Sequence, residues 1–177
     1  KLRVDGTLLT TGACTFTSSG GQWYGIEFYS GGGSSSLYGS TIQNAQYGVF
    51  VYNTSVPISN VTSRYNSTGI YTSVYYTQIH HSLVEENTYG VRCEYYGDPS
   101  IVFNNIIRYN GWGVYADAAS TPYLGNYPGY NSFWNDYYDV YSLYGGTIQA
   151  NGNWWGSYPA QPSIVGNVDY SQELTFD

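Results

Sequence analysis

The charged side chains best placed for chemistry are those of Arg92 and Glu94, on either side of Cys93, and of Asp117. In a strand, Arg92 and Glu94 share the face opposite to Cys93. Asp117 follows Glu94 by one repeat of the pattern described below, which predicts carboxylates about 5 Å apart on neighbouring strands. Paired carboxylates beside an arginine suit glycoside hydrolysis, and their oxygens could instead hold Ca²⁺. A plain surface ion pair is the third interpretation, and all three stay open.

Two other groups of ionisable residues favour structural roles. Arg64, Glu85 and Arg108 occupy equivalent repeat positions, so we expect an exposed Arg–Glu–Arg ladder worth roughly 0.2–1 kcal/mol per pair. His80 and His81 are adjacent and would point to opposite faces of a strand. Because no further metal ligands can be located beside them, we interpret them as structural or solvated residues.

Aromatic residues give the strongest hint of binding. A set of rings is expected to face outward along one sheet, namely Tyr29, Phe50, Tyr52, Tyr71, Tyr115 and Tyr141. Exposed flat rings beside a carboxylate suit sugar stacking. The same rings could stack on one another and stiffen the molecule, or contact a protein. Sugar binding requires Tyr71 and Tyr115 to be at least partly exposed.

These residues are positioned by an internal repeat of about 22 residues. Its signature is an aromatic residue, a glycine and an aliphatic residue, and variants of it centre on Gly25, Gly48, Gly69, Gly90, Gly113 and Asp139. The successive steps are 23, 21, 21, 23 and 26 residues. The longest step holds an insertion between Asp117 and Asn131, which we expect to bulge outward as a loop.

Several columns keep the register of this repeat. Apolar or small residues recur as Phe28, Val51, Thr72, Cys93, Ala116 and Ser142, and others as Leu37, Ile58, Ile79 and Val102. A polar column reads Asn66, Asn87, Asn110 and Asp136. Alternating apolar residues indicate short strands, and no single repeat could bury its own apolar face. We therefore predict stacked coils about 4.8 Å apart, with asparagine amides bonding from coil to coil.

The pattern from Val102 to Val114 resembles the coil repeat of the pectate-lyase-like superfamily of right-handed parallel β-helices. The segment Gly152-Asn153-Trp154-Trp155-Gly156, followed by Val168-Asp169-Tyr170, looks like the end of many such domains. The resemblance implies an all-β fold, a right-handed parallel β-helix (solenoid) of about seven coils. It implies one domain over residues 1–177, with coils over about 1–150 and a C-terminal cap over 151–177.

The resemblance does not define an activity, because this superfamily includes lyases, hydrolases, adhesins and structural fibres. Its lyases use a basic proton abstractor beside calcium or an arginine, and its hydrolases group several aspartates on neighbouring coils. This sequence has no internal lysine and no dense aspartate group.

Composition limits the partners. Five Lys and Arg against twelve Asp and Glu give a net charge of −7, so the chain offers no basic patch for nucleic acid or an acidic membrane. It contains no apolar run long enough to span a bilayer. With only 10% charged residues, the chain suits an extracellular or cell-surface location. It starts at Lys1, from which we expect a mature product or a fragment of a longer secreted protein.

The two cysteines, Cys14 and Cys93, fall in different columns about four coils apart, or roughly 19 Å. A disulfide needs Cα atoms within about 7 Å, so we expect two buried, unpaired thiols.

The sequence thus favours a non-catalytic, tyrosine-rich β-helix that serves as an extracellular surface or structural module. Open strand edges would let it stack end to end into a filament, and exposed aromatics would contact carbohydrate. Expected partners are other copies of the chain, other surface proteins or a polysaccharide. The alternative is a lyase or hydrolase of acidic polysaccharides that uses Arg92, Glu94 and Asp117. No cofactor is expected, with calcium at Glu94 and Asp117 as the open exception.

Overall fold

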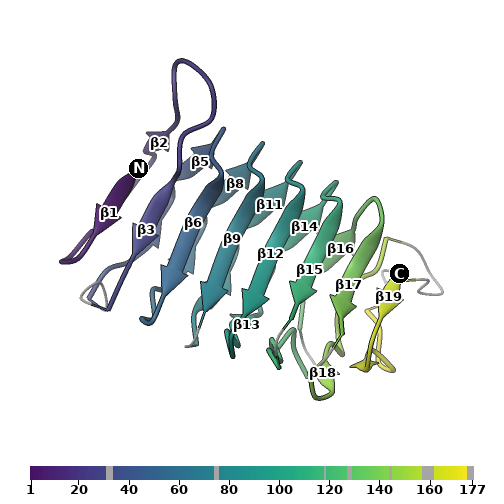
Figure 1. Ribbon diagram of the computed structural model, residues 1–177. Coiled ribbons are helices and arrows are strands. Elements are labelled where there is room, and N and C mark those ends of the chain that lie inside the picture. The colour runs from purple at the N-terminus through teal and green to yellow at the C-terminus, as the bar shows by residue number, and fades with distance from the viewer. Residues whose placement is uncertain are drawn as a thin grey trace.

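The computed structural model describes residues 1–30, 34–73, 76–117, 119–126, 129–143, 145–156 and 162–174. In these residues the only regular elements are short β-strands, which stack in parallel as about seven coils of a solenoid (Figure 1). The predicted all-β parallel β-helix is confirmed. Because each coil contacts its neighbours, the coils together enclose one continuous apolar core.

Three long sheets run along the solenoid. The first has eight strands, β1 (Leu2–Val4), β3 (Ile26–Phe28), β6 (Tyr47–Tyr52), β9 (Thr68–Ser73), β12 (Tyr89–Glu94), β15 (Trp112–Ala116), β17 (Tyr138–Ser142) and β19 (Ile164–Val165). The second has four, β4 (Leu37–Tyr38), β7 (Ile58–Ser59), β10 (Gln78–His80) and β13 (Ser100–Ile101). The third has six, β2 (Thr15–Phe16), β5 (Thr41–Gln43), β8 (Thr62–Arg64), β11 (Leu83–Glu85), β14 (Ile106–Arg108) and β16 (Ser132–Trp134).

A fourth, two-stranded sheet pairs β18 (Ile148–Gln149) with β20 (Val168–Asp169). Strand β19 also pairs with β17, so coil-like pairing extends into the segment predicted as a cap. Near the same end Trp155 is buried, and its ring stacks on Phe133 at a centroid distance of 4.8 Å.

The main sequence columns become stacks of paired residues. The aliphatic positions of the signature pair in register from β3 to β17, as Ile26, Val49, Ile70, Val91, Val114 and Val140. All six are fully buried, as are Phe28 and Ile107, and Val51 is 1% exposed. The period-2 pattern therefore identified the inward face of the first sheet correctly.

The glycine of the signature is required by the close approach of neighbouring coils. A Cβ atom on Gly48 would lie 2.5 Å from the carbonyl oxygen of Gly69, and one on Gly69 would lie 2.6 Å from that of Gly90. A side chain at these positions would force the coils apart.

The predicted asparagine ladder is present with one correction. The backbone N–H of Asn66 donates to Oδ1 of Asn87 at 2.9 Å, and the backbone N–H of Asn87 donates to Oδ1 of Asn110 at 3.0 Å. The next member is Asn135, which accepts from Asn110, and not Asp136, which is exposed. The corner after Phe133 is one residue shorter than the corner after Ile107, so counting back from Asp139 misplaced the ladder by one position.

A second ladder was missed. The backbone N–H of Asn105 donates to Oδ1 of Asn131 at 3.2 Å, and the backbone N–H of Asn131 donates to Oδ1 of Asn153 at 3.0 Å. All three side chains are completely buried at the corner between the second and third sheets. The spacings of 26 and 22 residues between them were the available signal.

The first coil departs from the predicted register. Phe16 pairs with Ile42, and Gly25 follows Phe16 by nine positions, whereas in the next coil Gly48 follows Ile42 by six. This longer turn shifts Cys14 to a corner, where its side chain is exposed, so its predicted burial is wrong. Cys93 is buried and both thiols are free, as expected.

One further expectation of register differs from the structure. Ile79 pairs with Ile101, so Ile101 and not Val102 continues the column of Ile58.

In the insertion between Asp117 and Asn131, residues 118, 127 and 128 lie outside the described residues. The expectation that this insertion bulges outward is wrong for its described part, which joins the coils on both sides. Asn126 pairs with Asn151, Gly129 accepts a backbone hydrogen bond from Phe103, and Leu124 is fully buried.

Candidate functional site

Arg92 and Glu94 lie on the outer face of β12 and form an ion pair. Nε of Arg92 donates to Oε1 of Glu94 at 2.8 Å. The hydroxyl of Tyr71, on β9, donates to the other carboxylate oxygen at 3.0 Å. Both oxygens of Glu94 are therefore engaged, and its side chain is only 15% exposed.

Asp117 follows the end of β15, one coil beyond Glu94, as the repeat predicted. Its backbone N–H donates to the carbonyl oxygen of Cys93 at 2.9 Å, and its side chain is half-buried. Among the described residues, no three or more His, Cys, Asp or Glu side chains gather in a way that could hold a metal ion. Calcium binding at Glu94 and Asp117 thus gains no support from further carboxylates.

The environment of Arg92 fixes its charge. Burial lowers the pKa of its guanidinium, but the hydrogen bond and charge of Glu94 outweigh that effect, so the pKa is raised. Its guanidinium also lies over the rings of Tyr89 and Tyr115, at 5.0 and 5.6 Å from their centroids. Arg92 is therefore held as a cation within an aromatic cluster.

The aromatic residues predicted to face outward form a packed column on the first sheet. Phe50 and Tyr71 stack with centroids 4.6 Å apart, and Tyr115 and Tyr141 stack at 5.3 Å. Arg92 occupies the register position between Tyr71 and Tyr115. The rings and the guanidinium thus contact one another along the solenoid, which favours the structural interpretation of this column.

Exposure on this face is uneven. Tyr71 is 7% exposed, so the expectation that it is at least partly exposed is wrong: neighbouring rings and Glu94 cover it. Burial, followed by the charge of Glu94, raises the pKa of the Tyr71 phenol. Tyr115 is half-buried, as are Tyr29, Phe50 and Tyr141, and only Tyr52 counts as exposed, at 42%. Among the residues that the structure describes, this face offers no continuous platform of open rings.

The expected Arg–Glu–Arg ladder is present in its register, with Glu85 paired between Arg64 and Arg108. Glu85 is 8% exposed, so the expectation of an exposed ladder is wrong for this side chain, which bonds to Arg108 at 2.9 Å. Nε of Arg64 instead donates to Gln43 at 3.2 Å. Each arginine also covers the next residue, a tyrosine, with centroid distances of 5.3 Å for Tyr65 and 5.2 Å for Tyr109.

A row of exposed tyrosines lies instead at the corner between the first and third sheets. Here a shallow groove of about 520 Å³ is bordered by Tyr65, Tyr109 and Tyr137 and by the carboxylates of Glu86 and Asp136. Its floor consists of small polar groups from the corners of successive coils, including Asn66, Ser67, Asn87, Thr88 and Gly111. We call this site the corner groove.

The tyrosines of the corner groove are held by backbone conformation. Tyr65, Glu86 and Tyr109 each precede a ladder asparagine and have φ angles of 57°, 55° and 54°. This left-handed conformation turns their side chains outward while the asparagine points inward. Tyr65 and Tyr109 are 49% and 51% exposed, and Tyr137 is 62% exposed. A hydrogen bond to Glu86 raises the pKa of the Tyr65 phenol.

Sequence reasoning missed the corner groove because it sought aromatics on strands. A usable signal was present, since Tyr65-Asn66, Glu86-Asn87 and Tyr109-Asn110 place a large side chain directly before the inward asparagine. A corner residue whose successor points inward must itself face solvent.

His80 and His81 also differ from expectation. His80 ends β10, and His81 has a φ angle of 53°, so the chain turns between them. Their Nδ1 atoms are 3.0 Å apart, and the side chains converge where a strand would have placed them on opposite faces.

Comparison with protein-family models identifies the fold family. The model of the right-handed beta helix region matches residues 24–153, so this chain belongs to that family, and the coils are right-handed. Neither the comparison with curated proteins nor that with solved structures finds a match. In the described residues, no helix is long and apolar enough to cross a membrane.

Proposed function

We propose that this protein is a non-catalytic extracellular or cell-surface β-helix that binds a polysaccharide chain along the corner groove. The observation that supports the proposal most is the exposed row of Tyr65, Tyr109 and Tyr137 beside two carboxylates. Phenol rings can stack on the apolar faces of sugars, while carboxylate, amide and hydroxyl groups accept and donate hydrogen bonds to sugar hydroxyls.

The spacing of the groove supports a long ligand in preference to a single sugar. Tyr65 and Tyr109 occupy equivalent corners two coils apart, which corresponds to about 10 Å. Because Tyr65, Glu86 and Tyr109 border the groove from three successive coils, the groove suits an extended polymer. The outward-facing set from the sequence, which includes the buried Tyr71, contributes less to such a surface.

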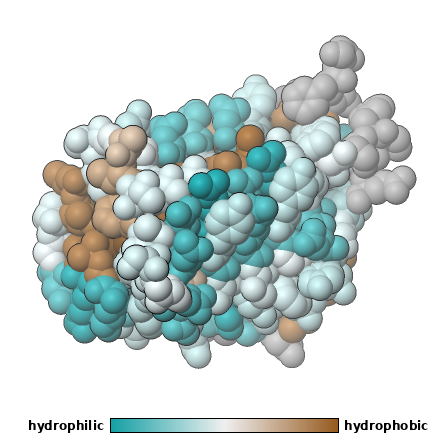
Figure 2. Space-filling model, turned by 90° about the horizontal axis from the view of Figure 1, so that it is seen from above, coloured by the Kyte–Doolittle hydropathy of each residue, from teal (hydrophilic) through white to brown (hydrophobic). Residues whose placement is uncertain are grey.

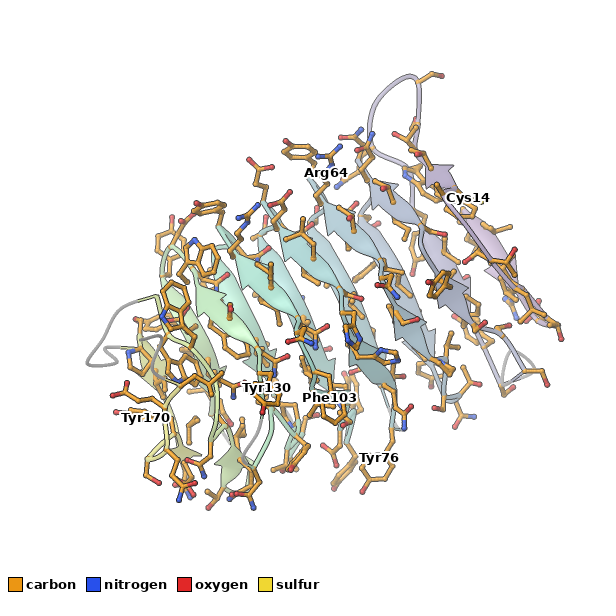
Figure 3. The ribbon with its side chains drawn as sticks, turned by 180° about the vertical axis from the view of Figure 1, so that it is seen from behind. Cys14, Arg64, Tyr76, Phe103, Tyr130 and Tyr170 are labelled. Atoms are coloured by element: carbon orange, nitrogen blue, oxygen red, sulfur yellow. The ribbon has the colours of Figure 1, made fainter. Side chains whose placement is uncertain are left out.

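The test compares two tyrosines of matched conformation. Tyr109 and Tyr130 have φ angles of 54° and 53° and are 51% and 47% exposed, but Tyr130 lies at a different corner (Figure 3). In affinity electrophoresis with soluble polysaccharides, Tyr109→Ala should weaken binding about tenfold, equivalent to about 1.4 kcal/mol. Tyr130→Ala should leave it unchanged. Equal effects of the two substitutions, or binding by neither variant nor wild type, would overturn the proposal.

The enzyme alternative makes a different prediction. A lyase or hydrolase that used Arg92, Glu94 and Asp117 would release unsaturated products or reducing ends from acidic polysaccharides, and Glu94→Gln would abolish the release. The engagement of both Glu94 oxygens by Arg92 and Tyr71 favours a structural role for this carboxylate. We therefore expect no product release from the wild type.

End-to-end assembly is a second candidate function, and one surface feature favours it. In the first coil, Leu9 is 59% exposed and Leu2 is 36% exposed, and apolar residues gather at this end of the molecule (Figure 2). Strand β1 is an edge strand of the first sheet, and among the described residues it pairs with one neighbour, β3. Such an edge can accept a strand from a second copy of the chain. Sedimentation of this 177-residue chain over a range of concentrations tests for filaments.

A further inference from the structure

The two histidines of the chain form a compact pair on a side of the solenoid that the proposed function does not use. The rings stand at 84° to one another with centroids 5.3 Å apart, and their Nδ1 atoms approach to 3.0 Å. The pair lies at the corner between the second and third sheets, where Phe103 is labelled in Figure 3.

The backbone holds this arrangement in place. The N–H of His81 donates to the carbonyl oxygen of Phe103 at 2.8 Å, and the carbonyl oxygen of His80 accepts from the hydroxyl of Ser82 at 3.0 Å. The backbone of each histidine is therefore tied to a neighbouring group. A ligand that binds between the two rings needs to order only their side chains.

We propose that His80 and His81 chelate a divalent transition-metal ion, such as Zn²⁺ or Cu²⁺, through their two Nδ1 atoms. Histidine nitrogens bind zinc at about 2.0–2.1 Å, so two ligands at about 90–110° to one another around the metal lie roughly 3 Å apart. The observed separation of 3.0 Å fits this geometry. The side chains supply two ligands, and water would complete the coordination.

The surroundings suit this chemistry. A hollow of about 380 Å³ beside the pair, lined by Gln78, Ser100 and Phe103, leaves room for water ligands. A neutral imidazole carries a lone pair on one ring nitrogen, which it can donate to a metal ion. Imidazole favours Zn²⁺ and Cu²⁺, whereas Ca²⁺ prefers oxygen ligands.

Metal binding would change the tautomers of the pair and release no net proton. Without metal, one Nδ1 carries a proton and donates it to the other Nδ1. With metal, both Nδ1 atoms bind the ion through their lone pairs. The proton that left Nδ1 is then carried by Nε2 of the same ring, so both Nε2 atoms are protonated. Nε2 of His81 lies 3.4 Å from the amide of Asn104, which could then rotate to accept its hydrogen, as partners of metal-bound histidines commonly do.

The test is an NMR titration with zinc sulfate of the Cys14→Ser variant, which removes the exposed thiol as a competing ligand. Because the chain has two histidines, every imidazole signal belongs to this pair. We expect one Zn²⁺ per chain, shifts of both Nδ1 resonances, and no response to Ca²⁺. His80→Gln and His81→Gln, each in the same background, should each weaken binding at least about tenfold.

The proposal is overturned if only one ring responds, if zinc contacts Nε2, or if either single variant binds zinc as tightly as the parent. Thermal unfolding provides a second measurement that does not depend on the variants. An ion that binds the folded pair should raise the melting temperature with increasing Zn²⁺ concentration. An unchanged melting temperature at saturating Zn²⁺ also counts against the site.

Discussion

At Gly69, one missing methyl group allows two coils to reach their normal spacing. A Cβ atom there would lie 2.6 Å from the carbonyl oxygen of Gly90 and 2.9 Å from the side chains of Asn87 and Val84. Gly69→Ala should therefore lower the free energy of unfolding by about 1–3 kcal/mol, the usual cost of overpacking. Urea denaturation measures it. The matched control is Gly6→Ala, where a Cβ atom meets no heavy atom within 4 Å and the stability should change little.

The two thiols should react very differently. Cys14 is exposed, whereas Cys93 is buried, and burial raises the pKa of the Cys93 thiol to about 12. Since the thiolate is the reactive form, folded protein at pH 8 should show one fast thiol per chain with a disulfide reagent. The second should appear at the rate of unfolding. Two fast thiols in native protein would contradict the described position of Cys93.

At the scale of structural elements, the asparagine ladder fastens the corners of successive coils. Asn87 accepts the buried N–H of Asn66 and donates to the carbonyl oxygen of Ser63 at 3.0 Å. Asn87→Ala leaves these groups without partners, so we expect a loss of about 1–3 kcal/mol in the free energy of unfolding. Asn167→Ala, at an exposed site, is the control. Equal stabilities of the two variants in urea denaturation would show that the ladder contributes little.

Strand positions were predictable because the inward residues of equivalent strands repeat at nearly constant intervals. Phe28, Val51 and Ile107 are buried where the periodicity placed them. The errors fall at corners, where one coil gains or loses residues: the long turn after Phe16 exposed Cys14, and the short corner after Phe133 replaced Asp136 by Asn135. Corner length depends on backbone conformation, which residue spacing alone does not specify.

At the scale of the whole molecule, the site was harder to predict than the fold. Alternation along a strand separates inside from outside, but it does not say how far rings on the outer face cover one another, as Phe50 covers Tyr71. Nor does it describe left-handed corners, which expose Tyr65 and Tyr109 and bring His80 against His81. The corner groove and the histidine pair both lie at corners, where the chain leaves strand geometry and strand periodicity makes no prediction.

The net charge of −7 should select the kind of polysaccharide that the corner groove binds. Glu86 and Asp136 border the groove, so a polyuronate would be repelled by these carboxylates and by the net negative charge of the chain. A neutral glycan carries no charge and would not be repelled. We expect neutral polysaccharides to bind with little dependence on salt. Acidic ones should bind more weakly, and more tightly as NaCl screens the repulsion, because the Debye length falls from about 30 Å at 0.01 M to about 8 Å at 0.15 M. Affinity electrophoresis at both salt concentrations measures this. The variant Glu86→Gln should reduce the difference in affinity between neutral and acidic ligands. Tighter binding of the acidic ligand at low salt would contradict this prediction, and it would show that the arginines beside the groove, not its carboxylates, govern recognition.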